Sequence, residues 1–387
     1  FSGKIPDTLG SLKSLADLYL SNNFLTGELP KSLFRIPALN YLHAERNNLT
    51  GLIPQNVGEA KELLDLRLFD NQFSGTIPES IGNCSKLEIL YLHKNKFVGS
   101  LPASLNLLEN LTDLFVANNS LRGTVRFGST KCRNLVTLDL SSNQFEGGVP
   151  PELGKCSSLD ALVIVKCNLS GKIPPTLGML KNLTILNRLS ESIPAELGNC
   201  TNLSTLKLNN NQLGGRIPSA LGQIPTEITE LKNLKIVTLF NNSFHGVIPP
   251  GLVFNLGSNR LHGKIPPSVS QCKTISRFIL RENNLTGLLP DFSKNHDLTF
   301  LDLNSNSFQG AIPRSLGSCR KLTTINLYRN KLTGNIPTEL VILRNLNLGF
   351  NLLDGSVPSK FSNWKELTTL VLSGNRFSGF VPPDRHP

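Results

Sequence analysis

Apolar and polar positions follow one pattern along most of this chain, and the pattern repeats every 24 residues. Residues 277–290, RFILRENNLTGLLP, hold one copy: a short apolar run, an Asn, a Leu two residues later, a Gly two after that, and an apolar residue followed by Pro. Such recurrence indicates a stack of repeats. At this spacing the Asn and the Gly recur as Asn23, Asn47, Asn71, Asn95, Asn119 and Asn143, and as Gly27, Gly51, Gly75, Gly99, Gly123 and Gly147.

Each repeated residue type has a physical role in such a stack. Alternating apolar residues, for example Leu18 and Leu20, point inward from a short strand and pack against neighbouring repeats. A buried Asn can hydrogen-bond the unpaired backbone groups of adjoining turns, so that successive Asn residues form a ladder. Gly permits a positive φ, and Pro ends local pairing. We therefore predict an α/β-type repeat solenoid with a parallel β-sheet on its concave face, forming a single domain over residues 1–387 with about sixteen repeats, some truncated.

The period fails in four places, and we predict irregular repeats there. They lie near residues 187–194, 218–225, 250–266 and 338–358. Seven extended residues span at most about 25 Å, so residues 217–225 are too short for a complete repeat. We expect the ladder to be interrupted near Arg188, Gln223 and Phe254. Arg126 replaces the Pro of its repeat and marks a further departure.

Composition and motifs argue against several functions. The net charge is +11, but the basic residues are scattered without a run, which does not favour nucleic-acid binding. The six His residues show no HExxH spacing, so we expect no metal site and no cofactor. Neither a phosphate-binding Gly loop, an HRD or DFG tripeptide, nor a GxSxG elbow is present, so we expect this chain not to be an enzyme. It also holds no run of eighteen apolar residues that would span a membrane.

The seven cysteines follow the repeat register, which argues against a disulfide framework. Cys167 occupies an Asn position of the ladder, and the other six share one position of the repeat. We therefore predict that all seven are buried thiols. Cys132 and Cys156 could approach each other on adjoining repeats, and a bridge there is possible but not required. The six that share a position are Cys84, Cys132, Cys156, Cys200, Cys272 and Cys319.

Ten N-x-S/T sequons are compatible with a secreted glycoprotein, although the repeat consensus itself generates some of them. The candidate glycosylation sites are Asn48, Asn83, Asn110, Asn118, Asn168, Asn182, Asn199, Asn202, Asn241 and Asn284.

These repeats resemble the plant-type extracellular leucine-rich repeat, as in LADLYLSNNFLTGELPKSLFRIPAL. Stretches such as CKTISRFILRENNLTGLLPDFS and FSNWKELTTLVLS are similar to the ectodomains of plant Pep receptors, which are receptor kinases that sense danger peptides. The resemblance implies an ectodomain on the extracellular side of the plasma membrane. It would bind a secreted, extended peptide on its concave face and recruit a leucine-rich-repeat co-receptor kinase in innate immune signalling. The full-length parent would be a serine/threonine protein kinase. We expect this segment to lack both caps, the transmembrane helix and the kinase.

Alternation along each strand places a set of non-core residues on the concave face. Exposed aromatic residues at matched strand positions are typical of peptide grooves, whereas solvated polar strands remain the alternative interpretation for most positions. The candidate peptide-binding residues are Tyr19, Tyr41, His43, Arg67, Phe69, Tyr91, His93, Phe115 and Phe240.

Two arginines project from one strand and suit a carboxylate. Arg277 and Arg281 flank Ile279, and a pair of guanidiniums can bind a carboxylate through bidentate hydrogen bonds. A solvated ion pair of Arg281 with Glu282 is the alternative. Because the resembling receptors read the C-terminal carboxylate of their ligands with concave arginines, we assign that role to Arg281 with Arg277 assisting. The family also implies a co-receptor at the C-terminal repeats, facing Thr324, Asn326 and Tyr328 and, more loosely, Thr369 and Val371.

Two other functions remain open from the sequence. A soluble cell-wall inhibitor of a pathogen polygalacturonase uses a similar repeat, although such inhibitors typically have about ten repeats with both caps. A non-functional truncated product is the other alternative. The length of the chain and its Pep-receptor-like stretches favour the receptor.

Overall fold

The computed structural model describes residues 1–126, 132–179, 182–189, 192–194, 205–217, 236–248, 255–271, 275–357 and 364–378. The chain forms two compact units. Unit 1 consists of Phe1–Ser190 with Cys200–Lys207, and unit 2 consists of Glu191–Asn199 with Leu208–Pro387. Gln223 and Phe254, where we predicted interruptions, lie outside the described residues.

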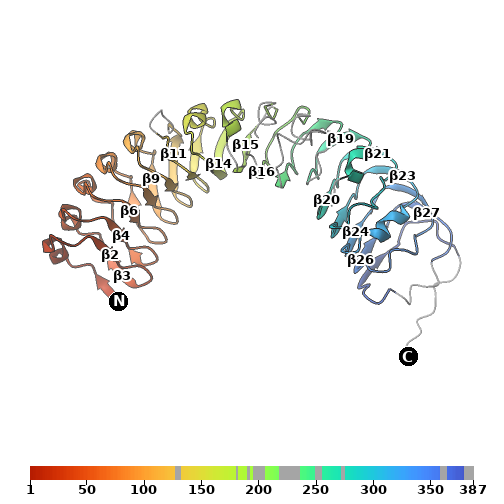
Figure 1. Cartoon of the computed structure of the whole chain (residues 1–387), viewed down its shortest axis with the longest axis horizontal. Coiled ribbons are helices and arrows are strands. Elements are labelled where there is room, and N and C mark those ends of the chain that lie inside the picture. The colour runs from red at the N-terminus through yellow and green to blue at the C-terminus, as the bar shows by residue number, and fades with distance from the viewer. Residues whose placement is uncertain are drawn as a thin grey trace. The chain divides into compact units, whose positions relative to one another are not determined.

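Unit 1 is built on a sheet of parallel strands, which we call its inner sheet because it lines the inner side of the unit's curve (Figure 1). Each repeat contributes one strand at the same place, so that Leu18 pairs with Leu42 and Leu42 with Leu66. Their buried side chains form the core. In chain order the strands are β2 (Asp17–Tyr19), β4 (Tyr41–His43), β6 (Asp65–Arg67), β8 (Ile89–Tyr91), β10 (Asp113–Phe115), β12 (Thr137–Asp139), β14 (Ala161–Gly171), β15 (Asn182–Leu189) and β16 (Thr205–Lys207).

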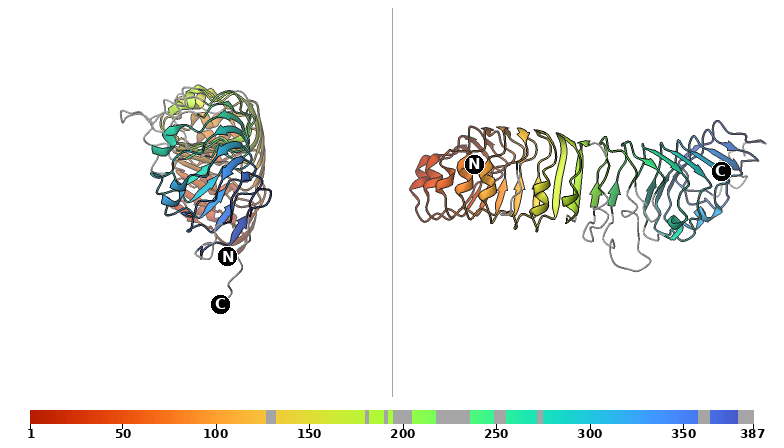
Figure 2. Two further views of the ribbon diagram at one scale, coloured as in Figure 1. Left: turned by 90° about the vertical axis from the view of Figure 1, so that its right-hand side faces the viewer. Right: turned by 90° about the horizontal axis from the view of Figure 1, so that it is seen from above.

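The chain of unit 1 returns from each inner strand through a second short strand and, in most repeats, a 3₁₀ helix. The second strands also pair in parallel, while the helices lie on the outer side (Figures 1 and 2). These strands are β1 (Ser2–Lys4), β3 (Phe24–Gly27), β5 (Asn48–Leu49), β7 (Ser74–Gly75), β9 (Lys96–Gly99), β11 (Ser120–Thr124) and β13 (Gln144–Glu146). The helices are η1 (Asp7–Ser11), η2 (Lys31–Arg35), η3 (Val57–Glu59), η4 (Glu79–Asn83), η5 (Ala103–Leu107), η6 (Pro151–Lys155) and η7 (Pro175–Met179).

Unit 2 has the same construction. Its inner sheet holds β20 (Arg277–Ile279), β22 (Phe300–Asp302), β24 (Thr324–Asn326), β26 (Asn345–Asn347) and β28 (Thr369–Val371) in that order. Another inner-side strand is β17 (Ile236–Thr238). The second sheet is formed by β18 (His245–Gly246), β19 (Arg260–Gly263), β21 (Asn284–Gly287), β23 (Ser307–Gly310), β25 (Lys331–Gly334) and β27 (Leu352–Leu353), and the outer helices are η10 (Pro267–Gln271) and η11 (Arg314–Ser318). The predicted leucine-rich-repeat solenoid is confirmed, whereas its extent as one continuous domain stays a prediction.

The Asn ladder is present as predicted. Asn71 is buried; its Oδ1 accepts a hydrogen bond from the Leu49 amide at 3.0 Å, and its Nδ2 donates to Ala44 O at 2.9 Å and Leu68 O at 3.2 Å. Each Asn thus joins its own turn to the preceding repeat. Cys167 takes one position of the ladder and donates from Sγ to Leu140 O at 3.2 Å. Equivalent bonds are made by Asn47, Asn95, Asn119, Asn143, Asn242, Asn259, Asn283, Asn306, Asn330, Asn351 and Asn375.

Pairing between β14 and β15 is irregular. Val165 pairs with Leu186, but the next pair joins Ser170 to Arg188, so the register shifts in between. This shift lies beside the repeat that the sequence marks as irregular near 187–194.

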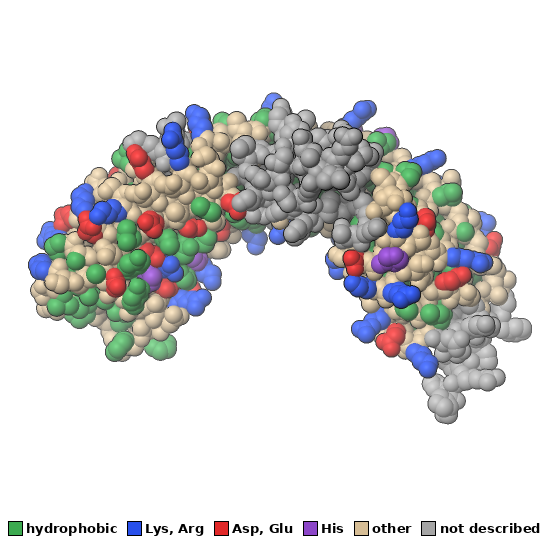
Figure 3. Space-filling model, in the orientation of Figure 1, with side chains coloured by type: hydrophobic (Ala, Val, Ile, Leu, Met, Phe, Trp, Pro, Cys, Tyr) green, Lys and Arg blue, Asp and Glu red, His purple; other side chains and the backbone are tan. Residues whose placement is uncertain are grey.

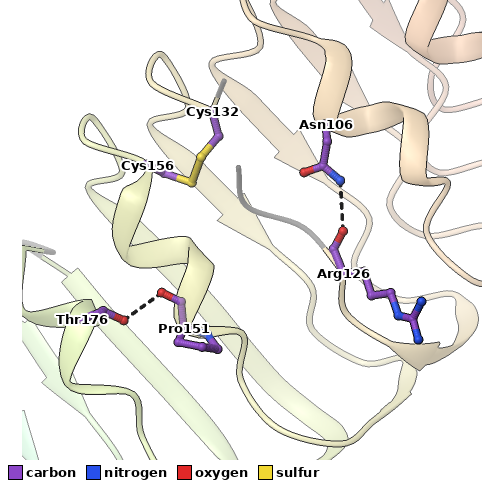
Figure 4. Close-up of a disulfide and its surroundings, with 6 residues drawn as sticks. All are labelled: Asn106, Arg126, Cys132, Pro151, Cys156 and Thr176. Carbon is purple, nitrogen blue, oxygen red and sulfur yellow. Dashed lines mark hydrogen bonds between the residues drawn. A yellow bond between two sulfur atoms is a disulfide. The ribbon is translucent and has the colours of Figure 1, made fainter. Parts of the chain in front are cut away.

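The prediction that all seven cysteines are thiols is wrong for two of them. Cys132 and Cys156 form a disulfide, with their Cα atoms 4.9 Å apart (Figure 4). The reason is their adjacency: strand-to-strand spacing in a sheet is about 5 Å, and these cysteines occupy the same position of adjoining repeats. In the two repeats that adjoin the repeat of Cys84, the same position holds Ala60 and Leu108. Cys84 therefore has no cysteine at this position in either adjoining repeat. Cys84, Cys167 and Cys319 are buried free thiols as predicted, while Cys200 and Cys272 lie outside the described residues.

Candidate functional site

The inner sheet of unit 1 brings one row of predicted residues together. Tyr19, His43, Arg67, Tyr91 and Phe115 occupy the same position on β2, β4, β6, β8 and β10, and each pairs with the next. The leucine that precedes each of these residues points into the core and is buried. Because side chains alternate along a strand, the row itself points away from the core, onto the inner face of the sheet. The register predicted from the sequence is therefore correct for these positions.

Three rings at the first strands of the inner sheet form a contact cluster. The ring centroids of Tyr19 and His43 lie 4.8 Å apart in an edge-to-face arrangement, and Tyr41 lies 6.5 Å from Tyr19 and 6.1 Å from His43. Such geometries are favourable for aromatic side chains. Tyr19 is 59% exposed, so an apolar ring face remains open to a ligand.

A second ring cluster follows on the next strands. Phe69 stacks on His93 with centroids 4.3 Å apart, and Tyr91 stacks on Phe115 at 4.6 Å. Tyr91 also lies 6.3 Å from Phe69. Burial raises the pKa of the Tyr91 hydroxyl, so this ring remains neutral at ordinary pH. Together these half-buried rings offer a continuous apolar surface of the kind that anchors peptides.

Asp65 links the two ring clusters. Its buried carboxylate accepts hydrogen bonds from Arg67 Nε at 3.0 Å and from the terminal nitrogen Nη2 at 2.8 Å. His43 Nε2 lies 3.1 Å from Asp65 Oδ2, without the alignment of a hydrogen bond. The guanidinium of Arg67 in turn lies over the ring of Tyr91, 5.1 Å from its centroid. The bond to Asp65 raises the pKa of Arg67, so this charge is permanent.

Two further polar side chains at this face have buried atoms without a hydrogen-bond partner. They are Glu45, whose Oε2 is buried, and His93, whose Nδ1 is buried. Burial, followed by the nearby charge of Lys94, lowers the pKa of His93, so this imidazole is held neutral. The sequence placed Glu45 on the concave face but did not mark it as a site residue. Figure 3 shows hydrophobic, acidic, basic and His side chains gathered along the inner edge of unit 1.

In unit 2, Arg277 and Arg281 lie on the inner face as predicted, with Phe278 and Leu280 buried between them. The guanidinium of Arg277 lies over the ring of Phe300, 4.2 Å from its centroid. Arg281 Nε lies 4.0 Å from Glu282 Oε1, and both side chains are about half exposed. An ion pair of that length and exposure is weak, so it leaves Arg281 available to a stronger anion.

The residues predicted to face a co-receptor also lie on the inner side of unit 2. Thr324 and Asn326 begin and end β24, and Tyr328 follows that strand. The sequence missed a neighbour: Phe350 is 51% exposed, and its ring lies 5.3 Å from that of Tyr328. Phe350 has a φ of 54°, which is unusual for a bulky residue. Phe240 is half-buried after β17, and the ring contacts of the described residues do not include it.

Most candidate glycosylation sites have exposed side chains. Asn110 Nδ2 donates to Ser85 O at 2.9 Å and Asn241 Nδ2 to Asn210 Oδ1 at 3.0 Å, so a glycan there would leave one N–H of each amide for these bonds. Asn182 begins β15. Asn199 and Asn202 lie outside the described residues. The exposed sites are Asn48, Asn83, Asn110, Asn118, Asn168, Asn241 and Asn284.

The described residues offer neither a metal-binding group nor a membrane-spanning helix. These residues contain no group of three or more His, Cys, Asp or Glu arranged to hold a metal ion. None of their helices has the length and hydropathy needed to span a bilayer.

Comparison with known proteins identifies the repeats and their relatives. The Leucine Rich Repeat model matches residues 14–36, 62–84, 134–156, 202–224, 297–319, 321–341 and 366–384. A 29-residue stretch, 8% of this chain, is 76% identical to the leucine-rich repeat receptor-like protein kinase PEPR1 of Arabidopsis thaliana and covers 3% of that protein. The crystal structure of PEPR1 with AtPEP1 matches at 56% identity and a TM-score of 0.57, covering 99% of this chain and 68% of that one.

Two other solved receptors match along nearly the whole chain. The plant peptide hormone receptor RGFR1 in complex with RGF2 has a TM-score of 0.92 and 35% identity over 98% of this chain. The Arabidopsis receptor kinase HAESA, solved with the peptide hormone IDA and the co-receptor SERK1, has a TM-score of 0.69 and 30% identity over 99% of it. The chain spans 62% of the RGFR1 structure and 74% of the HAESA structure.

Proposed function

This chain belongs to the family of plant leucine-rich-repeat receptor ectodomains, the group that includes PEPR1, and on that premise we propose that it binds a secreted danger peptide in innate immune signalling. The peptide would lie extended on the concave face. The single observation that carries this proposal is the run of partly exposed rings on unit 1, from Tyr19 to Phe115, held in register by consecutive strands.

The chemistry of the inner face fits an extended peptide better than a small molecule. Ring pairs recur from strand to strand at a spacing of about 5 Å, so several side chains of one extended ligand can each meet a ring. Charged groups between the rings, such as Asp65 and Arg67, supply polar contacts that fix register and orientation. Relatives that match this chain were solved with peptides: AtPEP1 on PEPR1 and RGF2 on RGFR1.

We assign the C-terminal carboxylate of the peptide to Arg281, with Arg277 assisting. The contact of Arg277 with Phe300 fixes its guanidinium on the inner face, and the loose pair with Glu282 leaves Arg281 free to reorient. A carboxylate can accept two parallel hydrogen bonds from a guanidinium. Because Arg281 is about half exposed, we expect this contact to contribute about 2 kcal/mol, or roughly 30-fold in Kd.

The test is a calorimetric titration of AtPEP1 into the wild-type chain and Arg281→Ala. The substitution should weaken binding roughly 30-fold, and amidation of the peptide's C-terminus should weaken wild-type binding by a similar factor. Arg260→Ala is the matched control, because Arg260 is an exposed arginine at the start of β19 on the second sheet. If amidation and Arg281→Ala each leave the affinity within about twofold, the carboxylate is bound elsewhere.

We further propose that the parent protein is a plasma-membrane receptor kinase whose ectodomain recruits a co-receptor through the C-terminal repeats, at Thr324, Asn326 and Tyr328. HAESA was solved with the co-receptor SERK1, which supports this arrangement. Substituting Tyr328 by Ala should abolish peptide-dependent association with a co-receptor ectodomain in size-exclusion chromatography. Unaltered association would remove these residues from the interface.

A further inference from the structure

The first six inner strands of unit 1, β2 to β12, carry a net negative charge although the chain as a whole is strongly basic. In each of these repeats we consider the segment that begins with the inner strand and ends just before the ladder Asn. Together these segments hold six acidic and three basic residues. Their net charge is therefore −3 with neutral His, whereas the whole chain has a net charge of +11. The acidic residues are Asp17, Glu45, Asp65, Asp70, Asp113 and Asp139, and the basic ones are Arg46, Arg67 and Lys94. A cationic partner is therefore favoured at this face.

Three of these carboxylates lie in one row. Asp17, Asp65 and Asp113 occupy the first position of every second inner strand, with Tyr41 and Ile89 between them in the register. Adjoining strands are about 4.8 Å apart, so the carboxylates recur at intervals of about 10 Å. The side chains of an extended ligand can meet such a row one after another.

The middle carboxylate shows which chemical group this arrangement holds. Asp65 is occupied by the chain's own Arg67, whose guanidinium forms a two-pronged hydrogen bond with the carboxylate and lies over the ring of Tyr91. A carboxylate at the first position of one strand and a ring at the third position of the next strand thus form a binding site for a guanidinium. Both contacts favour a cation, the first by charge and the second by the electron-rich ring face.

Asp17 also lies among rings and has no internal cation, although His43 holds the place on β4 that Tyr91 holds on β8. Tyr19 follows it on β2, and Tyr41 pairs beside it on β4. Its charge raises the pKa of the Tyr19 hydroxyl, after the larger effect of burial. In the described part of the chain, no ion pair or side-chain hydrogen bond engages the exposed Asp17 carboxylate.

A second carboxylate without a partner lies elsewhere on the same face. Glu45 lies two residues after His43 and therefore on the same side of β4; it is 9% exposed, and its Oε2 has no hydrogen-bond partner. A buried carboxylate oxygen left unpaired is costly. The same face thus holds a further carboxylate, which adds to its preference for a cation.

We propose that Asp17, Tyr19 and Tyr41 form a subsite for a cationic side chain, a guanidinium or an ammonium, of the bound peptide. This inference rests on the proposed peptide-binding function and specifies the chemistry of one ligand position. The cation pairs with the Asp17 carboxylate and lies over the open face of Tyr19. Arg67, which is already bound to Asp65, separates this subsite from the ring cluster of Phe69, Tyr91 and Phe115.

The test uses a single cation in place of the peptide. Saturation-transfer NMR with argininamide and the full chain should give a saturable signal that weakens in 0.5 M salt, because an exposed charge pair is screened. Citrullinamide, which has the same shape without the charge, should give little signal. Asp17→Asn and Tyr19→Leu should each weaken argininamide binding about two- to fivefold, the size expected for one exposed charge pair or one ring contact.

Glu28→Gln is the matched control, because Glu28 is an exposed acidic residue that follows β3 on the second sheet. It should leave the signal unchanged. Equal signals from the two amides, or retention of the argininamide signal in Asp17→Asn, would overturn the proposal. Failure of AtPEP1 to bind while argininamide still binds at Asp17 would instead contradict the proposed function and leave the subsite standing.

Discussion

Removal of one ladder residue should destabilise unit 1 far more than its size suggests. Asn71 makes four hydrogen bonds: Leu49 N donates to its Oδ1 at 3.0 Å, and its Nδ2 donates to Ala44 O, Leu68 O and Phe69 O at 2.9, 3.2 and 3.3 Å. Asn71→Ala leaves the Leu49 amide without its acceptor in a position closed to water. The three carbonyl oxygens lose one donor each and keep another, from Asn47, Asn95 and the Arg46 amide. At about 1 kcal/mol for each well-formed bond and less for the two long ones, the loss amounts to about 3 kcal/mol.

Urea unfolding followed by circular dichroism measures that loss, and amide hydrogen exchange localises it. The Leu49 amide should lose protection in Asn71→Ala, because its acceptor has been removed. Asn48→Ala is the matched control: Asn48 is exposed on β5 in the same repeat, and a surface change of this kind should stay within about 0.5 kcal/mol. If Asn71→Ala stays within the same limit and the Leu49 amide remains protected, the ladder does not carry the stability ascribed to it.

Two further perturbations test the fold and its electrostatics. Cys132→Ser should destabilise the chain by about 3 kcal/mol in urea, because the lost bridge to Cys156, 24 residues away, no longer restricts the unfolded chain; an unchanged urea midpoint would show that the bridge does not form in solution. Burial lowers the pKa of His93 in the fold, so the unfolded chain takes up the proton first and stability should fall as the pH decreases through about 6.5. In His93→Phe the fall should be smaller, and an identical pH profile would show that another group causes it.

The repeat could be predicted from the sequence because each repeated residue meets one backbone requirement. Asn71 is the donor and acceptor that a closed turn needs, and Gly75 adopts a φ of 69°, which glycine tolerates best. By contrast, the residue before each ladder Asn also has a positive φ, yet residues as different as Arg46, Asp70 and Phe350 occupy it. No residue type marks that position, so the pattern did not show it.

The site was only partly predictable for a related reason. Strand alternation placed His43, Asp65 and Arg67 on one face, but only side-chain geometry shows that Asp65 is buried and that Arg67 is committed to it. The disulfide of Cys132 with Cys156 was only an open alternative, because one core position of the repeat accepts cysteine, leucine or alanine equally well. Its pairing depends on a second cysteine in the adjoining repeat, which is a feature of two neighbours and not of the repeat.

The central claim is that the inner face of unit 1 binds a peptide through its rings. Calorimetric titration of AtPEP1 into the wild-type chain, Tyr91→Ala and Leu107→Ala tests it most directly. Tyr91 stacks on Phe115 at the inner face, whereas Leu107 is a more exposed apolar residue, 53% exposed, at the end of η5. We expect saturable one-to-one binding that weakens at least about tenfold in Tyr91→Ala and is unchanged in Leu107→Ala. Absence of binding to the wild-type chain, or equal effects of the two substitutions, would contradict it.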